Sequence, residues 1–320
     1  MVFSLKPKVT VGVCVRNCES YIKDAINSIL KQDFPHELME VIVVDGYSKD
    51  RTVKIAKELL GNSDIKTRIF FEDKGLGVAR QMVVDNAIGD YIVWVDGDMM
   101  LSTEYLRKLV DFISKHLEVG IVKGKQALQP GKNLLATLEG YSRIAGRMVN
   151  YQSEKGCSKA LGTAGALCRT KALIDAGGFD KSLVGYNEDW DIEIRVRAKG
   201  WSLHTIDAFY LDYERRKISW NDLWNRYWLR GYYTHYFLHK NKGMLKHYRI
   251  FPPAAFLGGL LHAFSLFKKT CQKTVFLLPL QYVFKMTAWY VGFMKSHLDS
   301  YAPQFTEIQS NRMLTRCRLK

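Results

Sequence analysis

The sequence predicts an α/β fold with a mostly parallel, doubly wound central sheet. In the first half of the chain, short apolar runs alternate with amphipathic stretches of about ten to fifteen residues. Strands and helices that alternate in this way form parallel sheets with helices on both faces. In addition, two of the apolar runs end in aspartate, which places polar groups where such sheets bind ligands.

The strand and helix units follow one another from residue 8 onward. We expect strands over residues 8–15, 40–45, 65–72 and 91–96, and helices over residues 20–32, 50–61, 76–89 and 102–116. The carboxyl ends of parallel strands lie at one edge of the sheet. Asp45 closes the second strand and Asp96 the fourth, so we expect both carboxylates to face one crevice.

The middle of the chain has a less regular pattern. We expect a strand and then a short helix that ends at Gly177 and Gly178, because glycine commonly ends a helix. A helix over residues 187–200 and an alternating strand over residues 201–211 follow. These elements complete a first domain over residues 1–218.

Residues 219–320 are predicted to form a basic, aromatic and helical region. From Tyr213 onward the chain holds 18 Lys and Arg against 4 Asp and Glu, within a net charge of +15 for the whole sequence. This excess favours a polyanionic partner such as an anionic membrane surface, although a soluble basic face is the alternative. Only the basic tail favours nucleic acid, so we expect no nucleic-acid partner.

Two apolar segments in this region, residues 251–267 and 274–294, suggest membrane contact. The first would reach about 25 Å as a helix, short of a bilayer core of about 30 Å. The second contains Lys285, and a lysine at the centre of a span costs about 2.5–3.5 kcal/mol on insertion scales. We therefore expect helices that lie in the membrane interface, with a helical hairpin through the bilayer or soluble core helices as alternatives.

The spacing of small and polar residues supports interfacial helices. They follow one stripe in each segment: Gly258, His262, Ser265 and Lys269 in the first, and Thr274, Gln281, Lys285, Gly292 and Lys295 in the second. The remaining faces are broadly apolar. We expect Lys268, Lys269, Lys273 and Lys295 to lie near lipid headgroups.

The cysteines and the first residues indicate the compartment. Six cysteines are scattered, without a C-x-x-C pair, which favours reduced thiols in the cytosol. The chain enters its first strand without a long apolar run, so we expect no secretion signal. The prediction is a membrane-associated protein whose active site faces the cytoplasm.

Asp96-Gly97-Asp98 places two carboxylates at the end of an apolar strand. Like charges so close repel one another and resist burial, so a bound cation would explain the pair. Hard divalent cations such as Mn²⁺ or Mg²⁺ take carboxylate oxygens together with diphosphate oxygens. Gly97 allows the backbone to turn and a ligand to approach. A solvated turn is the alternative.

Two further loops carry groups suited to a nucleotide. Lys74-Gly75-Leu76-Gly77 precedes a helix that contains Arg80, and glycines with a cation at a helix start suit an anionic ligand. A tight turn explains the glycines equally well. Asp45 is suited to accept a hydrogen bond from a base or ribose, or else to cap the following helix.

The run Glu188-Asp189-Trp190-Asp191 puts three carboxylates at the start of a predicted helix. Acidic residues at this position complement the helix dipole. The alternative is a general base beside a metal-bound donor. The sequence alone leaves both readings open.

Together these stretches resemble family 2 glycosyltransferases with the GT-A fold. The resemblance covers about residues 8–205 and keeps the motifs in order: "VRNCESYIKD", "KGLGVARQ", "YIVWVDGDMM", "GTAGALC" and "YNEDWDIEIRVRAKGW". It implies a hexosyltransferase that binds a nucleotide-diphospho-sugar, such as a UDP- or GDP-sugar, across the strand ends. It also implies Mn²⁺ or Mg²⁺ as cofactor.

The resemblance assigns roles to individual residues. Those that match the family's donor-binding segments are Val15, Asn17 and Glu19 in the first loop, Asp45 at the nucleobase, and Lys74 and Arg80 along the diphosphate. Those that match the metal, sugar and catalytic segments are Asp96 and Asp98 (with Asp98 the favoured metal ligand), Gly162 and Thr163 beside the sugar and acceptor, and Glu188 and Asp189. Asp189 matches the general base of inverting members.

The sequence departs from the family pattern at two places. Tyr213 stands about where many members carry a metal-binding histidine, with Asp212 as a possible substitute. The Q-x-x-R-W motif of processive synthases has no match, although Arg226 and Arg230 remain. These arginines are either ligands of an acceptor phosphate or ordinary surface residues.

We therefore expect an inverting enzyme that transfers a single sugar to a lipid-linked acceptor in a metal-dependent reaction. Polyprenyl phosphate, a lipid-linked oligosaccharide and a glycolipid are the acceptors considered. A processive polysaccharide synthase is the enzymatic alternative. A catalytically silent membrane-bound scaffold of the same fold is the alternative from another class.

Overall fold

A central mixed sheet dominates the computed structural model, which describes residues 8–127, 129–147, 161–212, 217–241 and 252–299. Its eight strands lie in the order β3-β2-β1-β4-β7-β6-β8-β5. They are β1 (Val9–Val15), β2 (Met39–Asp45), β3 (Lys66–Phe71), β4 (Tyr91–Trp94), β5 (Met100–Leu101), β6 (Val119–Gln126), β7 (Ala166–Arg169) and β8 (Ser202–Leu211). β1 to β4 pair in parallel, as predicted, and so do β6 and β8. β7 is antiparallel to β4 and β6, and β5 to β8.

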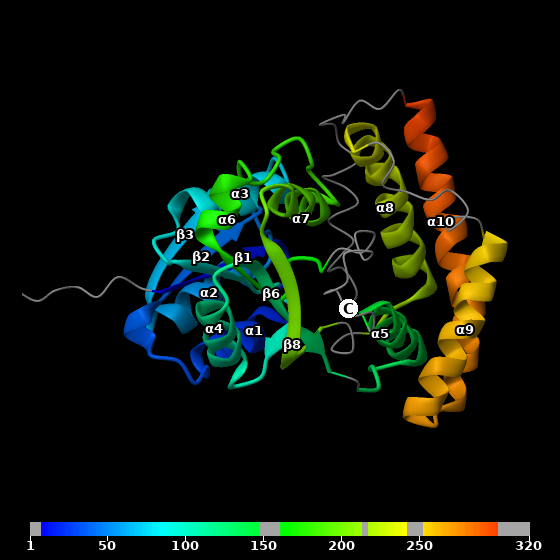
Figure 1. Ribbon diagram of the computed structural model, residues 1–320, viewed down its shortest axis with the longest axis horizontal. Helices are drawn as coiled ribbons and strands as arrows, with labels where there is room; N and C mark the ends of the chain where they lie inside the picture. Colours follow the sequence, from blue (N-terminus) through cyan, green and yellow to red (C-terminus); the bar gives the residue numbers. More distant parts are fainter. Residues whose placement is uncertain (1–7, 128, 148–160, 213–216, 242–251, 300–320) are drawn as a thin grey trace, which may run out of the picture.

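Helices cover both faces of this sheet (Figure 1). One face carries α1 (Ile22–Leu30), α2 (Thr52–Gly61) and α4 (Tyr105–Lys115), and the other carries α3 (Leu76–Asn86), α6 (Thr170–Asp175) and α7 (Glu188–Ala198). A short 3₁₀ turn, η1 (His36–Leu38), precedes β2. Because side chains alternate along a strand, β2 sends Val41 and Val43 into one apolar core and Ile42 and Val44 into the other.

The C-terminal helices form a bundle with α5 (Leu134–Arg147) beside the sheet (Figure 1). They are α8 (Trp220–Lys240), α9 (Pro252–Thr270), the 3₁₀ helix η5 (Lys273–Leu277) and α10 (Leu278–Leu298). Two small apolar clusters hold them against α5. α8 and α10 approach closely: a Cβ on Gly231 would lie 1.8 Å from the Trp289 carbonyl oxygen, and one on Gly292 would lie 2.0 Å from that of Trp228.

Three residues of the polar stripe on α10, Gln281, Lys285 and Gly292, face the protein, whereas Lys295, which we expect near lipid headgroups, is exposed. Gln281 and Lys285 are buried, and the Lys285 ammonium lies 2.9 Å from a carboxylate oxygen of Glu139 on α5. The buried counter-charge explains why a lysine sits in an apolar segment. Within the described ranges, no helix combines the length and apolar character needed to cross a bilayer.

Three elements escaped the sequence analysis. β5 has only two residues, too few to show a period. In β6 and α5, charged residues interrupt the apolar ones, so neither strand nor helix periodicity stands out. Tyr213, singled out as a departure from the family pattern, lies outside the described residues. Among the described residues, Cys14, Cys18, Cys168 and Cys271 form no disulfide.

Candidate active site

Arg80 on α3 joins two motifs that are far apart in the sequence. Its side chain is buried, at 5% exposed. The guanidinium forms an ion pair with Glu188 and lies 3.9 Å from an Asp96 carboxylate oxygen. It also lies over the Trp94 ring, 5.9 Å from the ring centre. The start of α3 after Lys74-Gly75-Leu76-Gly77, the turn Asp96-Gly97-Asp98 (the D-x-D turn) and the start of α7 at Glu188-Asp189 (the E-D helix) therefore meet at one place.

The Asp96-Gly97-Asp98 turn packs against the end of β1. A Cβ on Gly97 would lie 2.8 Å from Val15 Cγ1, so only glycine allows this close approach. Val15 is in register with Asp45 on β2. Asp45 and the D-x-D turn thus lie at the same edge of the sheet, with the end of β1 between them, as the sequence predicts.

The two carboxylates of this turn fit a divalent cation. Burial raises the pKa of Asp96, Arg80 opposes the rise, and the neighbouring Asp98 charge adds to it. Mg²⁺ is commonly held by one or two carboxylates together with substrate phosphates. Within the described residues, no three His, Cys, Asp or Glu side chains gather to hold a metal, so a diphosphate would have to complete the coordination.

Asp212, considered as a third metal ligand, has another partner. Its side chain is buried, and one carboxylate oxygen lies 3.3 Å from the Arg143 guanidinium. Arg143 also lies 4.0 Å from Glu139. The structure therefore places Asp212 in an ion-pair network that leads to α5.

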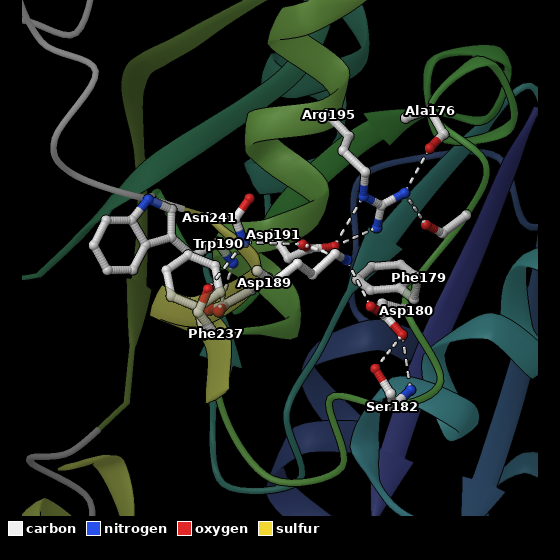
Figure 2. Close-up of polar contacts among 12 residues, drawn as sticks. Ala176, Phe179, Asp180, Ser182, Asp189, Trp190, Asp191, Arg195, Phe237 and Asn241 are labelled. Carbon is white, nitrogen blue, oxygen red and sulfur yellow. Dashed lines mark hydrogen bonds and ion pairs between the residues drawn. The ribbon is translucent and has the colours of Figure 1, made fainter. Parts of the chain in front are cut away.

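The three carboxylates of the run Glu188-Asp189-Trp190-Asp191 have three different environments, and Figure 2 shows those of Asp189 and Asp191. Glu188 pairs with Arg80. Asp189 accepts a hydrogen bond from the Trp190 amide at 2.8 Å. Asp191 is fully buried and accepts from Arg195 at 2.6 and 2.8 Å. Each carboxylate therefore has a partner of its own, and Asp191 has a structural role, because it holds the Arg195 side chain that donates to the carbonyl oxygens of Ala176 and Gly178.

Glu188 is the most unusual of these carboxylates. Burial raises its pKa, Arg80 opposes the shift, and the adjacent Asp189 charge adds to it. Its Oε2 atom is buried and has no hydrogen-bond partner among the described residues. A buried carboxylate oxygen in this state is suited to accept a hydrogen bond from a ligand hydroxyl.

The predicted sugar and acceptor loop lies against Asp189. A Cβ on Gly162 would be 3.3 Å from Asp189 Oδ2, and Gly162 has a left-handed backbone with φ of 73°. The next residue, Thr163, is buried, and its carbonyl accepts from the Ala166 amide at 2.7 Å. The structure thus brings Gly162, Thr163 and Asp189 together as expected.

The predicted nucleotide loops are held together mainly by their own hydrogen bonds. Asp45 is fully buried and accepts from the Ser48 amide and hydroxyl at 2.7 and 2.5 Å. Asn17 donates its amide to the same hydroxyl at 2.8 Å and accepts from Lys49 at 2.8 Å. Glu19 accepts from an amide of the same loop at 2.9 Å. Asp45 does not cap the following helix, because α2 begins at Thr52, its N-cap residue is Arg51 and no side chain caps it. The contact of Asp45 with a nucleobase stays a prediction.

The glycines of the K-G-L-G motif are required by packing. A Cβ on Gly75 would lie 2.5 Å from the Val184 carbonyl oxygen, and one on Gly77 would lie 2.6 Å from that of Asp180. Lys74 is exposed, and its amide donates to Glu72 at 2.5 Å. The motif therefore docks the start of α3 on the 180–184 loop, and this docking carries Arg80 into the site.

Two buried charged residues at the site were missed by the sequence analysis. Lys123 on β6 is 2% exposed and Glu193 on α7 is 4% exposed. Glu193 follows Asp189 by four residues, and this spacing places both on one face of a helix, so a signal was available. Lys123 belongs to an unpredicted strand and gave no signal.

Two family models match the chain. The model described as glycosyl transferase family 2 matches residues 10–159. The model described as glycosyl transferase family group 2 matches residues 91–296, which is more than half of the chain.

Curated relatives are similar over part of their length. The poly(ribitol-phosphate) β-N-acetylglucosaminyltransferase TarS of Staphylococcus aureus is 34% identical over 110 residues, which cover 34% of this chain and 19% of TarS. The poly-β-1,6-N-acetyl-D-glucosamine synthase of Staphylococcus epidermidis is 24% identical over 209 residues, covering 65% of this chain and 48% of the synthase. The match therefore spans less than half the length of either relative.

Solved structures share the fold. The crystal structure of S. aureus TarS residues 1–349 superposes with a TM-score of 0.52 at 18% identity, covering 91% of this chain and 92% of that one. The Pyrobaculum calidifontis mannosyltransferase PcManGT, solved with GDP-Man and Mn²⁺, superposes with a TM-score of 0.62 at 17% identity, covering 92% and 88%. The family match and the shared fold agree with the motif order: the chain belongs to glycosyltransferase family 2 and has the GT-A fold.

Proposed function

We propose that this enzyme transfers one sugar at a time from a nucleotide-diphospho-sugar to a lipid-linked acceptor, with inversion at the anomeric carbon. The observation that carries the proposal is the meeting of Asp96, Arg80 and Glu188 beside Asp189 and Gly162. The Arg80 guanidinium beside the Asp96 and Glu188 carboxylates suits the binding of a diphosphate. The half-buried Asp189 carboxylate, which follows Glu188 in the chain, suits a general base. Solved relatives of the same fold hold UDP-GlcNAc or GDP-Man, which supports a nucleotide-sugar donor.

The residues of the site would divide the work between donor and acceptor. A divalent cation on Asp96 and Asp98 would neutralise the charge of the leaving diphosphate. Arg80 holds Asp96 and Glu188 in place and adds positive charge next to the donor. Glu188 Oε2 would accept a hydrogen bond from a sugar hydroxyl. Asp189 would take the proton of an acceptor hydroxyl, whose oxygen attacks from the face opposite the leaving group.

Whether the reaction requires a general base depends on the acceptor. If the acceptor is a lipid phosphate, it is already ionised and requires no base. Asp189 would then orient the acceptor. Because the attack comes from one side in a single displacement, inversion is expected in both cases.

A lipid-linked acceptor is supported by the surface of the C-terminal helices. Of eighteen large apolar side chains that are exposed among the described residues, eleven lie on α9, η5 and α10. They are Phe256, Leu257, Leu261, Phe264, Phe276, Leu277, Leu280, Tyr290, Val291, Met294 and Leu298. Exposed apolar residues in this number favour contact with a protein or a membrane, and the adjacent exposed Lys268, Lys269 and Lys273 favour an anionic membrane surface on the cytoplasmic side.

Arg226 and Arg230 have partners within the bundle. Arg226 is buried and lies 3.9 Å from a Glu139 oxygen. Arg230 lies over the rings of Tyr186 and Tyr227, at 5.6 and 5.0 Å from the ring centres. The structure therefore gives these arginines structural contacts, and we do not assign them to an acceptor phosphate.

One observation favours the processive alternative. The S. epidermidis relative, a poly-β-1,6-N-acetyl-D-glucosamine synthase, matches 65% of this chain. Product length distinguishes the two enzymes, because a single transfer adds one sugar to each acceptor and a synthase adds many. The silent-scaffold alternative predicts no turnover under any condition.

The direct test measures binding and turnover of UDP-GlcNAc and GDP-mannose with and without Mn²⁺. We expect one donor to bind by calorimetry with Mn²⁺ and to release its nucleoside diphosphate slowly to water. Asp98→Ala should abolish the Mn²⁺-dependent binding. Asp189→Asn should leave donor binding unchanged and stop transfer to a hydroxyl acceptor. Normal turnover in both variants would place the active site elsewhere.

A further inference from the structure

Lys123 and Glu193 grip the same peptide from opposite sides. The Lys123 ammonium donates to the carbonyl oxygens of Leu161 and Gly162 at 2.7 and 2.9 Å. The Glu193 carboxylate accepts from the amides of Leu161 and Gly162 at 2.8 and 2.7 Å. All four polar groups of two consecutive residues are thereby bound by two charged side chains.

The burial of the Lys123 and Glu193 charges has a large cost in desolvation free energy, which a purely structural packing role would not require. Removing an ammonium and a carboxylate from water costs several kcal/mol for each ion. The backbone groups of a loop can be satisfied by neutral side chains or by water. A charged side chain on each side instead fixes the peptide in one position, because hydrogen bonds to charged groups are short and strong.

The gripped peptide lies at the chemistry of the site. The Cβ position on Gly162 is 3.3 Å from Asp189 Oδ2 and 3.7 Å from Lys123 Nζ. Glu193 lies one helical turn after Asp189 on α7. A displacement of the Leu161–Gly162 peptide would therefore change the backbone surface that contacts the Asp189 carboxylate.

We propose that Lys123 and Glu193 are positioning residues that clamp the Leu161–Gly162 peptide against Asp189. The clamp sets the position of an acceptor oxygen relative to the Asp189 carboxylate. This inference rests on the proposed function, because it assigns Asp189 to the acceptor. Neither residue needs to touch the substrate, so both act through the peptide that they hold.

The charges around Glu193 make the clamp sensitive to pH. Burial raises the pKa of Glu193, the Asp189 charge adds to the rise, and the two amides and Lys123 oppose it. Cys168 on β7 also feels this charge. Protonated Glu193 accepts hydrogen bonds less well than the carboxylate, so the clamp should weaken as the pH falls through the raised pKa.

The experiment compares Lys123→Met, Glu193→Gln and the double variant with the wild type. Lys125→Met is the matched control, because Lys125 lies on the same strand, is exposed and pairs with the exposed Asp207. The readouts are thermal melting, calorimetric binding of UDP-GlcNAc or GDP-mannose with Mn²⁺, and the rate at which the bound donor is hydrolysed with water as the acceptor. The double variant removes both charges and so avoids an unbalanced buried ion.

We expect unchanged donor affinity and a hydrolysis kcat lowered about 100-fold in each single variant, as for a small misplacement of reacting groups. The double variant should be little worse than either single variant, because both hold one peptide. The acid limb of the kcat profile should be smaller in Glu193→Gln than in the wild type, and the limb that remains would come from the carboxylates that act on the substrates. An unchanged kcat, or an equal loss of donor affinity and kcat, would overturn the proposal.

Amide hydrogen exchange separates this inference from the proposed function. In Lys123→Met and in Glu193→Gln the amides of Leu161 and Gly162 should exchange faster than in the wild type. In the control Lys125→Met these amides should stay protected. This readout requires no donor and no turnover. If the wild type bound neither donor, faster exchange would still support the clamp, and unchanged exchange would refute it.

Discussion

Arg80 on α3 and Glu188 on α7 form a buried ion pair although 108 residues separate them in the chain. The pair exists because the Gly75 and Gly77 backbone packs directly on the 180–184 loop, which brings the two helix starts together. Arg80 also lies within 3.9 Å of Asp96. One side chain thus connects the proposed metal-binding turn with the proposed catalytic helix.

Replacing Arg80 with lysine should weaken donor binding. A lysine ammonium is a point charge and cannot present a planar fork to Glu188 and Asp96 together. We expect the donor Kd to rise by about tenfold or more, equivalent to about 1.4 kcal/mol, in calorimetric titration with Mn²⁺. Arg107→Lys, at an exposed ion pair with Asp33, is the control and should not change the Kd. Equal affinity in the wild type and Arg80→Lys would show that Arg80 has no part in donor binding.

A methyl group at Gly77 should destabilise the domain. The added Cβ would lie 2.6 Å from the Asp180 carbonyl oxygen, and relief of such a clash costs about 1–3 kcal/mol. Gly61→Ala is the matched control, because nothing lies within 4 Å of its Cβ position and alanine is the better helix former. Urea unfolding should therefore show a loss for Gly77→Ala and none for Gly61→Ala. If Gly77→Ala were as stable as the wild type, the 180–184 loop would be able to shift and relieve the contact at little cost.

Removal of the Lys285 charge should loosen the C-terminal bundle. Glu139 on α5 is fully buried and pairs with Lys285 at 2.9 Å, and loss of one partner leaves a buried charge poorly balanced. We expect Lys285→Met to cost about 3–5 kcal/mol in the free energy of unfolding. Lys285→Met combined with Glu139→Gln should recover part of this loss. Lys295→Met, at an exposed pair with Asp299, should change stability by less than about 1 kcal/mol.

His235 should make the bundle less stable in mild acid. Burial, together with the nearby His239 and His297, lowers the pKa of His235 to about 4, whereas an unfolded histidine titrates near 6.5. The unfolded chain therefore binds more protons between these values, so stability is complete above pH about 6.5 and falls as the pH drops toward 4. Melting at pH 7.5 and pH 5 should show this dependence in the wild type.

Two variants on α8 check the assignment to His235. In His235→Gln the difference in melting temperature between pH 7.5 and pH 5 should be smaller than in the wild type. In His239→Gln it should persist, because His239 is exposed and burial is the larger cause of the His235 shift. The same acid destabilisation in all three proteins would assign the effect to other groups.

The outward face of α9 should bind anionic membranes. Leu261 on α9 is 73% exposed and lies among other exposed apolar residues. Leu117, just after α4 and far from α9 in the sequence, is also 73% exposed. We expect Leu261→Asp to reduce sedimentation with phosphatidylserine-containing vesicles by more than tenfold, because insertion of a leucine contributes about 1.5–3 kcal/mol. Leu117→Asp should bind as the wild type does. Vesicle binding that is insensitive to Leu261→Asp would argue for another surface.

The sequence by itself determined the alternation of strands and helices in the first domain, and with it the edge at which Asp45 and Asp96 lie. Period-two and period-3.6 patterns are local, so they are readable without coordinates. The motif order was also sufficient to indicate the family, which the family match confirms.

Only the tertiary structure decided which partner each charged group has. The separate partners of Glu188, Asp189 and Asp191, the burial of Lys123, and the pairing of Lys285 with Glu139 join segments that are distant in the chain. No local pattern encodes such contacts, because hydrogen bonds and ion pairs depend on which elements the packing brings together. Close backbone approaches, as at Gly77 and Gly292, likewise become visible only after helices and loops have docked.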